Sequence, residues 1–321
     1  MKVLLLGPKG FGKMHLEAYS KLDVDVEIME RNRETADDLK SKFNIGKIYD
    51  NLEESMKSDA EIVDVVLPHN LHHDVVMKAL SVGKHVMVEK PIATEISDAR
   101  EMIEASKRAK RKFMVTDQYF FDPSVKKVKD EIEKGSLGRV HTIIIRDQRL
   151  YGWKGWRAEA AAMGGGSLID GGIHFVDTLL NFGGEYSDVK SLVYKTRNDL
   201  QEPDNAEALF KFKNGSNGIF FYSWGYPYPM NLPAFEVIGD RGSAIEDVSK
   251  KPDGFNYKEG KRAYGDPVIN GVHTDLGTHD IFVDEIGGFI KSVKEDRDVP
   301  FSPELALRDL VGVKDIFKNT I

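Results

Sequence analysis

The sequence predicts an α/β protein with a doubly wound parallel sheet at the N-terminus, followed by an α+β domain with a large, mostly antiparallel open sheet. Three observations carry this prediction. Short apolar runs alternate with amphipathic stretches over the first third, a glycine-rich turn follows the first run, and longer strand-like runs dominate after about residue 118. A chain of 321 residues is long enough for two domains, which we expect at 1–118 and 119–321.

The first part alternates strand and helix. Apolar residues recur at helical spacing over 73–83 and 96–111, with basic residues towards the end of these stretches. Right-handed crossovers join strands that alternate with helices, so this sheet is expected to be parallel. The predicted strands are apolar runs bounded by Gly, Pro or charge, at 2–6, 24–29, 62–67, 85–88 and 113–116.

The second part has a different pattern. Helices are expected at 124–134, over a glycine-rich stretch at 165–182, and at about 303–319. Strand-like runs separated by turn signals lie at 189–196, 206–213, 217–223 and 234–239. One of these signals, "KNGSNG", is typical of a hairpin connection, which favours an antiparallel sheet.

Composition narrows the class of partner. The net charge of −7 gives no electrostatic reason to expect a nucleic-acid partner, and the absence of cysteine excludes disulfides and thiolate sites. The opening "MKVLLLG" is too short for a signal sequence or a membrane span. We therefore expect a cytoplasmic protein with a small-molecule substrate and no membrane partner.

The turn "GPKGFG" after the first strand is a candidate phosphate loop. Backbone N–H groups and the helix N-terminus there can hold a pyrophosphate, which makes Gly7, Lys9, Gly10, Phe11 and Gly12 candidate cofactor ligands. Lys9 stands where the usual pattern has a glycine that permits close approach of the pyrophosphate. Either its ammonium group meets the phosphate, or Gly10 takes over the close approach; a plain strand-to-helix turn is the third alternative.

The second strand ends in an acidic residue. Glu30 lies at the interval expected for a carboxylate that accepts hydrogen bonds from the adenosine ribose, and such a carboxylate repels a 2′-phosphate. Arg31 and Arg33 follow it and can bind that phosphate. The prediction is therefore NAD, with NADP possible; a solvated loop acid is the alternative for Glu30.

Two further groups predict the chemistry. Glu89 and Lys90 follow the predicted strand 85–88, at the carboxyl edge where open parallel sheets bind ligands. Asp170 and His174 are four residues apart, so they share one face of the predicted glycine-rich helix. A carboxylate beside a histidine can orient the imidazole and raise its basicity, although a satisfied core histidine is the alternative.

Together these motifs resemble the glucose-fructose oxidoreductase and inositol dehydrogenase family, often called Gfo/Idh/MocA. The features are Gly7, Gly12 and His15, "PHNLH" at 68–72, "GKHVMVEKP" at 83–91, "WR" at 156–157 before "GGGSLIDGGIH", and "SW" at 223–224. The resemblance covers essentially the whole chain. It implies that Lys90, Asp170 and His174 form the catalytic group, with His174 as base, Asp170 orienting it, and Lys90 polarising the oxygen.

Some positions depart from the family pattern. Besides Lys9, Phe120 precedes Phe121 where relatives often have a polar residue, and His69 stands where asparagine is common. The resemblance makes the loop with Pro68, His69 and His72 a wall of the nicotinamide site, with His72 as a contact. We expect no metal there, because the histidines lack partners at recognisable ligand spacing.

The remaining candidates concern substrate and assembly. Tyr119, Trp153 and Arg157 belong to an aromatic group that can stack on a sugar ring or bind its hydroxyl groups, although such aromatics are more often core or subunit contacts. The second sheet is expected to have one face free of helices, and similar proteins use that face to form homodimers or homotetramers.

These observations predict an NAD(P)-dependent oxidoreductase that interconverts an alcohol and a carbonyl group on a sugar, cyclitol or related polyol. The alternative is a non-catalytic regulator on the same fold that senses a dinucleotide or a sugar, which the altered phosphate loop favours. Three retained catalytic residue types argue for the enzyme, because a sensor needs neither a base nor a cation that polarises oxygen. A dehydrogenase acting on an amino acid or pyrrole is a third possibility.

Overall fold

The computed structural model describes residues 1–152, 154–197, 199–228 and 230–321. The chain forms two compact units, one of Met1–Asp117 with Phe282–Leu307 and one of Gln118–Ile281 with Arg308–Ile321. This division differs from two contiguous segments at 1–118 and 119–321, because a stretch near the C-terminus belongs to the first unit.

The first unit contains a parallel sheet of six strands in the order β3-β2-β1-β4-β5-β6, which confirms the doubly wound prediction. Its edge strand β3 was not expected, because Gly46 and Lys47 interrupt the apolar pattern of "IGKIY". The strands are β1 (Lys2–Leu6), β2 (Asp25–Met29), β3 (Ile45–Tyr49), β4 (Ile62–Val65), β5 (His85–Glu89) and β6 (Phe113–Thr116).

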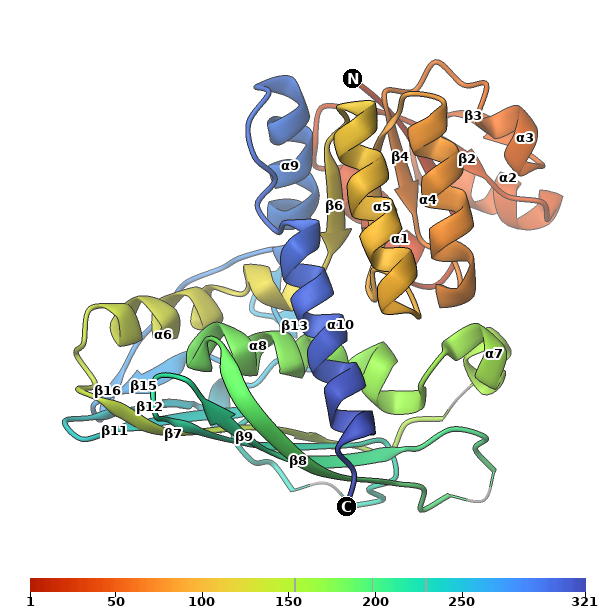
Figure 1. Ribbon diagram of the computed structural model, residues 1–321. Coiled ribbons are helices and arrows are strands. Elements are labelled where there is room, and N and C mark those ends of the chain that lie inside the picture. Colours follow the sequence, from red (N-terminus) through yellow and green to blue (C-terminus); the bar gives the residue numbers. More distant parts are fainter. Residues whose placement is uncertain (153, 198, 229) are drawn as a thin grey trace. The chain divides into compact units, whose positions relative to one another are not determined.

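Six helices accompany this sheet in the described chain, and Figure 1 shows α4 and α5 side by side on one face. The helices are α1 (Phe11–Tyr19), α2 (Arg33–Lys42), α3 (Leu52–Ser55), α4 (His72–Ser81), α5 (Ile96–Ala109) and α9 (Ile281–Lys294). Helix α9 was not expected in this unit. Its buried face includes Phe282, whose ring lies 6.0 Å from that of Phe11, so burial of apolar surface explains why it belongs here.

The second unit contains a sheet of eight strands in the order β16-β15-β12-β11-β7-β10-β9-β8. Among the strand pairs of this sheet that the structure describes, only β7–β10 is parallel, so the prediction of a mostly antiparallel sheet is confirmed. The strands are β7 (Val140–Gln148), β8 (Tyr186–Tyr194), β9 (Asn205–Phe212), β10 (Asn217–Ser223), β11 (Phe235–Gly239), β12 (Ser243–Glu246), β15 (Pro267–Ile269) and β16 (Val272–His273). A separate ribbon pairs β13 (Asn256–Tyr257) with β14 (Gly260–Lys261).

Helices cover one face of the large sheet. Figure 1 shows α6 (Pro123–Glu133) and α8 (Ile173–Gly183) above it, and α10 (Pro303–Lys318) belongs to this unit from residue 308. A short helix, α7 (Ala160–Met163), precedes α8. Phe210, Phe220 and Tyr222 point to the helical face and are fully buried, whereas the residues between them point the other way.

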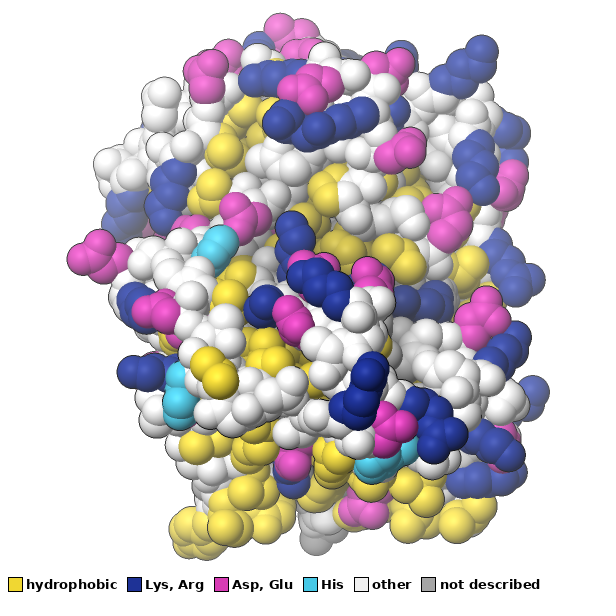
Figure 2. Space-filling view, turned by 90° about the vertical axis from the view of Figure 1, so that its left-hand side faces the viewer, with side chains coloured by type: hydrophobic (Ala, Val, Ile, Leu, Met, Phe, Trp, Pro, Cys, Tyr) yellow, Lys and Arg dark blue, Asp and Glu magenta, His cyan; other side chains and the backbone are white. Residues whose placement is uncertain are grey.

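The opposite face of the large sheet is partly apolar. Leu192, Leu209 and Ile219 are 43%, 60% and 41% exposed there, and Leu209 pairs directly with Ile219 across β9 and β10. In Figure 2 hydrophobic side chains gather along the lower edge, the level at which Figure 1 draws this sheet. Among the described residues, no helix is long and apolar enough to cross a membrane.

Candidate active site

The phosphate loop joins β1 to α1 and is shaped by three glycines. Gly7 and Gly12 have no room for a side chain, since a Cβ atom would lie 2.0 Å from the carbonyl oxygen of Val66 and 2.1 Å from that of Gly7, respectively. Gly10 has a φ of 54° and faces open space, with no atom within 4 Å of an added Cβ. The loop therefore fits a dinucleotide, and its shape favours Gly10 as the position of close approach.

Lys9 points to the carboxylate at the end of β2. Its Nζ lies 3.0 Å from Oε1 of Glu30, and the same oxygen accepts the backbone N–H of Asn32 at 2.7 Å. The Lys9 side chain is 54% exposed, whereas that of Glu30 is 9% exposed. One oxygen of Glu30 therefore already has a cation and a backbone donor beside it.

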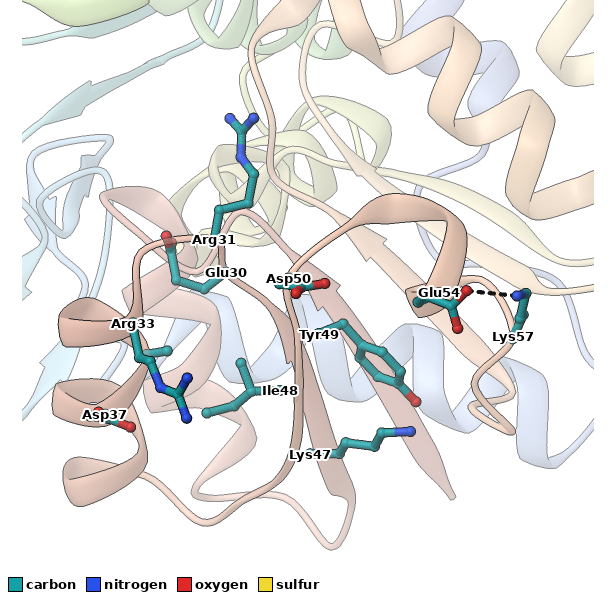
Figure 3. A pocket seen from close by; sticks show the side chains of 11 residues that line it. Glu30, Arg31, Arg33, Asp37, Lys47, Ile48, Tyr49, Asp50, Glu54 and Lys57 are labelled. Carbon is teal, nitrogen blue, oxygen red and sulfur yellow. Dashed lines mark hydrogen bonds and ion pairs between the residues drawn. The ribbon is translucent and has the colours of Figure 1, made fainter.

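A pocket of about 590 Å³ adjoins Glu30 in the first unit. Figure 3 shows its lining: Arg31 and Arg33 extend in opposite directions from the segment after β2, while Ile48, Tyr49 and Asp50 come from the end of β3 and the turn that follows it. Both guanidinium groups are exposed, and within the described chain neither forms an ion pair or hydrogen bond. The pocket therefore offers two cations beside the carboxylate.

Lys90 follows β5 and is buried despite its charge, with 8% exposure. Its backbone N–H donates to the carbonyl oxygen of Thr116 at 3.2 Å and to Oε2 of Glu89 at 3.2 Å. The peptide bond to Pro91 is cis. These contacts fix the chain direction at the carboxyl edge of the parallel sheet, where the sequence placed this lysine.

Glu89 belongs to a buried group of ionisable residues that was not predicted from the sequence. The ring of His15 on α1 lies between two carboxylates, with Nδ1 2.8 Å from Asp64 and Nε2 3.1 Å from Glu89. The Tyr19 hydroxyl donates to Asp64 at 2.7 Å, and Glu285 on α9 is also fully buried. We call these residues, His15, Tyr19, Asp64, Glu89 and Glu285, the His15 cluster. The sequence signal was Asp64, a lone carboxylate within the apolar strand "IVDV".

The His15 cluster is not electrically balanced. Burial alone lowers the pKa of His15, but the charges and hydrogen bonds of Asp64 and Glu89 outweigh it and raise that pKa well above its usual value. His15 is therefore an imidazolium that donates to both carboxylates. Burial, followed by the charge of Glu89, raises the pKa of Glu285 well above its usual range, so this carboxyl is kept neutral.

The loop after β4 is the predicted wall of the nicotinamide site, and its histidines are buried. His72 is fully buried, and its ring nitrogens lie 2.8 Å from the carbonyl oxygen of Pro91 and 2.9 Å from that of Leu67. Burial lowers its pKa to about 4, so the ring is neutral. His72 thus ties this loop to the Lys90 loop, and its contact with the nicotinamide stays a prediction. His69 is 3% exposed beside it, and Pro68 precedes it.

Asp170 and His174 lie on neighbouring turns in the second unit. Residues Leu168–Gly172 form a π-helical turn that leads directly into α8, and both side chains are buried. The Asp170 Oδ2 atom accepts a hydrogen bond from Nε of Arg157 at 2.5 Å, and the Arg157 guanidinium lies 4.4 Å from the ring centre of Trp156. Arg157, expected to touch substrate, is thus a partner of the acid itself.

His174 lies against an aromatic ring. Tyr119 stacks on it with 4.3 Å between ring centres and 14° between planes. Tyr119 is held in turn by edge contacts with Phe175 and Tyr264. The aromatic group expected at this site therefore restricts the orientation of the imidazole, while Trp153 lies outside the described residues.

The glycines around Asp170 pack closely against the sheet. A Cβ on Gly171 would lie 2.0 Å from the Tyr222 hydroxyl oxygen, and one on Gly172 would lie 3.1 Å from the Tyr222 ring. One on Gly166 would lie 2.3 Å from the carbonyl oxygen of Pro203. At these three positions the missing side chain permits close packing of protein atoms.

A further ion pair, between Asp147 and Arg149, lies near the same aromatic group and was not predicted from the sequence. Nε of Arg149 is 2.6 Å from Oδ2 of Asp147, which is 8% exposed. Burial lowers the pKa of Arg149, but the charges of Asp147, Tyr119 and Tyr222 raise it further than burial lowers it. The pair adds a second arginine and carboxylate to the aromatic group that holds His174. Within the described residues, no group of three His, Cys, Asp or Glu side chains has the arrangement of a metal site.

The two parts of the chain match models of two domains that belong to one family of oxidoreductases. A model described as an oxidoreductase family with an NAD-binding Rossmann fold matches residues 1–117, and a model of the GFO/IDH/MocA C-terminal domain matches residues 125–245. Myo-inositol 2-dehydrogenase of Thermotoga maritima is 25% identical over 317 residues, covering 95% of this chain and 91% of that protein. Levoglucosan dehydrogenase of Pseudarthrobacter phenanthrenivorans is 25% identical over 303 residues, covering 80% and 74%.

Solved structures share the fold. The structure of a levoglucosan dehydrogenase with NADH and levoglucosan matches with a TM-score of 0.83 at 21% identity, covering 99% of this chain and 96% of that one. An oxidoreductase from Thermotoga maritima matches with a TM-score of 0.87 at 22% identity, covering 99% and 96%.

Proposed function

The chain belongs to the Gfo/Idh/MocA family of oxidoreductases with an NAD-binding Rossmann domain, and from this premise we propose that it interconverts the hydroxyl and carbonyl forms of a carbon in a sugar, cyclitol or related polyol. The observation that carries the proposal is the retention of Lys90, Asp170 and His174 in such a chain. The names of two relatives, a myo-inositol dehydrogenase and a levoglucosan dehydrogenase, support a polyhydroxylated substrate.

The roles of the residues follow from their chemistry. When bound, NAD supplies an acceptor for the hydride that leaves the carbinol carbon. The loop with Gly7, Gly10 and Gly12 would hold its pyrophosphate, and Glu30 would accept a hydrogen bond from the adenosine ribose. These assignments rest on the open space at Gly10 and on the position of Glu30 after β2.

Side chains of the protein would accept the proton of the substrate hydroxyl and stabilise the charge that develops on its oxygen. Oxidation of an alcohol requires a base for the hydroxyl proton, which is the role of His174, with its ring orientation maintained by Tyr119. The Lys90 ammonium stabilises negative charge as it develops on the oxygen. Asp170 already binds the Arg157 guanidinium, so this pair is suited to hold a neighbouring substrate hydroxyl by accepting and donating hydrogen bonds.

The experiment measures reduced nicotinamide by absorbance while purified protein is incubated with NAD or NADP and a panel of aldoses, inositols, anhydrosugars and sugar acids. Lys90→Ala and His174→Ala are expected to lower kcat by a factor of about 100 or more with cofactor binding retained. Lys40→Ala and His141→Ala are matched controls, because both side chains are exposed. Unchanged turnover in both active-site variants would contradict the assignment.

A regulator that binds a dinucleotide or sugar without turnover is the second candidate. Lys9 in the phosphate loop is the observation that favours it, because it replaces a glycine of the usual pattern. The regulator would be supported over the enzyme if the folded wild-type protein binds a dinucleotide but turns over none of the substrates of the panel.

The open face of the large sheet is the proposed contact between copies of this chain. An apolar hollow of about 500 Å³ on this face is lined in part by Leu192, Leu209, Ile219, Phe221 and Ile321. An apolar surface of this kind favours association, and its continuous run along β8, β9 and β10 suits a second sheet. Light scattering is expected to give a dimer or tetramer for the wild type and a smaller species for Leu209→Lys. A wild-type monomer would contradict this assembly.

A further inference from the structure

The contact between the phosphate loop and the acid after β2 bears on cofactor choice. In dinucleotide-binding domains a carboxylate at the position of Glu30 selects NAD, because it accepts hydrogen bonds from both ribose hydroxyls and repels a 2′-phosphate. Here the carboxylate is already paired with Lys9, whose Nζ is 3.0 Å from Oε1. A lysine at a position usually held by glycine thus offsets the charge that would exclude NADP.

The two oxygens of Glu30 differ in their contacts. Oε1 accepts from Lys9 and from the backbone N–H of Asn32, whereas within the described chain Oε2 has no hydrogen-bond partner. One oxygen therefore remains to accept a ribose hydroxyl. NADP retains the 3′-hydroxyl of its adenosine ribose, so this single acceptor serves both cofactors.

Two arginines next to Glu30 can attract the 2′-phosphate of NADP. Arg31 and Arg33 line the pocket beside Glu30, and their guanidinium groups are exposed and unpaired within the described residues. Acidic side chains also line the pocket, and one of them, Glu54, pairs with Lys57, as Figure 3 shows. A guanidinium binds phosphate through two parallel hydrogen bonds, which a lysine does not provide.

We propose that the Lys9–Glu30 ion pair, together with Arg31 and Arg33, makes this protein bind NADP at least as tightly as NAD. The inference rests on the proposed function only in that both need a dinucleotide site. Lys9 is the specificity-determining residue: it removes the repulsion, and the arginines supply the attraction for the 2′-phosphate.

The test measures binding without turnover, by the fluorescence of NADPH and NADH titrated with purified protein. The wild type is expected to have a Kd for NADPH equal to or below that for NADH. Lys9→Met leaves the Glu30 charge uncompensated, so NADPH affinity is expected to fall roughly tenfold or more while NADH affinity changes less than about threefold. Lys40→Met, an exposed lysine on α2, is the matched control.

Two further variants separate charge from loop shape. In Lys9→Met/Glu30→Gln both charges are gone, so NADPH affinity is expected to recover relative to Lys9→Met alone. Arg31→Ala/Arg33→Ala is expected to lower NADPH affinity at least tenfold and to affect NADH less. A loss of NADPH and NADH affinity to the same extent in Lys9→Met would mean that Lys9 serves only the shared pyrophosphate, and would overturn the proposal.

The wild-type titrations also keep this inference distinct from the proposed function. NADH binding with NADPH at least tenfold weaker overturns the inference and leaves the oxidoreductase assignment intact. Failure of both cofactors to bind overturns both.

Discussion

Each unit buries a cluster of carboxylates around a central cation, and these two clusters differ in balance. In the second unit, Arg262 is fully buried between Asp122 and Asp266, with Nη2 3.2 Å from the first and Nη1 2.6 Å from the second. Asp122 also accepts the backbone N–H groups of Ala263 and Tyr264. We call Asp122, Arg262 and Asp266 the Arg262 cluster. Its carboxylates are bound by donors that do not titrate near neutral pH.

The His15 cluster of the first unit has more acid than it can pair. His15 binds Asp64 and Glu89, but neither carboxyl oxygen of Glu285 has a hydrogen-bond partner among the described residues. One oxygen of Asp64 is also unpartnered. A guanidinium therefore stays charged and bound to its carboxylates across the physiological pH range, whereas an imidazolium beside surplus acid makes stability depend on pH.

The largest effect is expected from breaking the balanced cluster. Arg262→Met would leave Asp122 and Asp266 buried without their cation, at a loss of about 3–5 kcal/mol in the free energy of unfolding. Urea denaturation measures it, with the 82% exposed side chain of Arg139, changed to Met, as control. A loss of under about 1 kcal/mol would show that backbone donors alone satisfy these acids.

The unbalanced cluster is expected to respond less. His15→Gln retains one donor group but removes the positive charge between Asp64 and Glu89, so we expect a loss of about 2 kcal/mol. Because Glu89 accepts the N–H of Lys90, kcat should fall too while KM for the cofactor changes little. If His15→Gln and the exposed control His141→Gln lose the same amount of stability, the charge of His15 does not stabilise the His15 cluster.

The His15 cluster is expected to make the stability of the protein depend on pH. His15 and Glu285 both bind protons more tightly in the folded protein, since their pKa values lie well above 6.5 and 4.5. The stability from His15 is complete below about pH 6.5 and is lost as pH rises through its folded pKa; Glu285 likewise lowers stability as pH rises above about 4.5. Unfolding free energy should therefore decline towards alkaline pH.

Glu285→Gln isolates the acid's share of that decline. A neutral isostere is expected to gain under about 1 kcal/mol at pH 6 and more at pH 9, flattening the dependence. Denaturation at both values measures it. If the free energy of unfolding of Glu285→Gln falls with pH as steeply as that of the wild type, a group other than Glu285 causes the decline.

The smallest effect is expected at the exposed pair. Lys9→Met breaks an ion pair in which the lysine is 54% exposed, so the free energy of unfolding should change by less than about 0.5 kcal/mol. Thermal unfolding checks this. A larger loss would mean that a change in NADPH affinity reflects a misfolded loop.

Elements that depend on local pattern were predictable. The run 2–6 agrees with β1, and the apolar positions of 96–111 agree with α5, because period and flanking residues suffice for such elements. The long central strand β7 was not predicted, since its neighbours β10 and β11 are distant in sequence and only their pairing reveals it. Helix α9 was missed for the same reason, because its place depends on contacts with residues near the start of the chain, such as Phe11.

The chain by itself therefore determined the fold class, the phosphate loop, the acid after β2 and the presence of Lys90, Asp170 and His174, because these follow from residue type and spacing. Only the tertiary structure decided the partners: His72 ties two loops, Arg157 binds Asp170, and Lys9 lies against Glu30. The physical reason is that charge and hydrogen-bonding capacity belong to a residue, whereas the group that satisfies them is set by which distant segments the fold brings within about 3 Å.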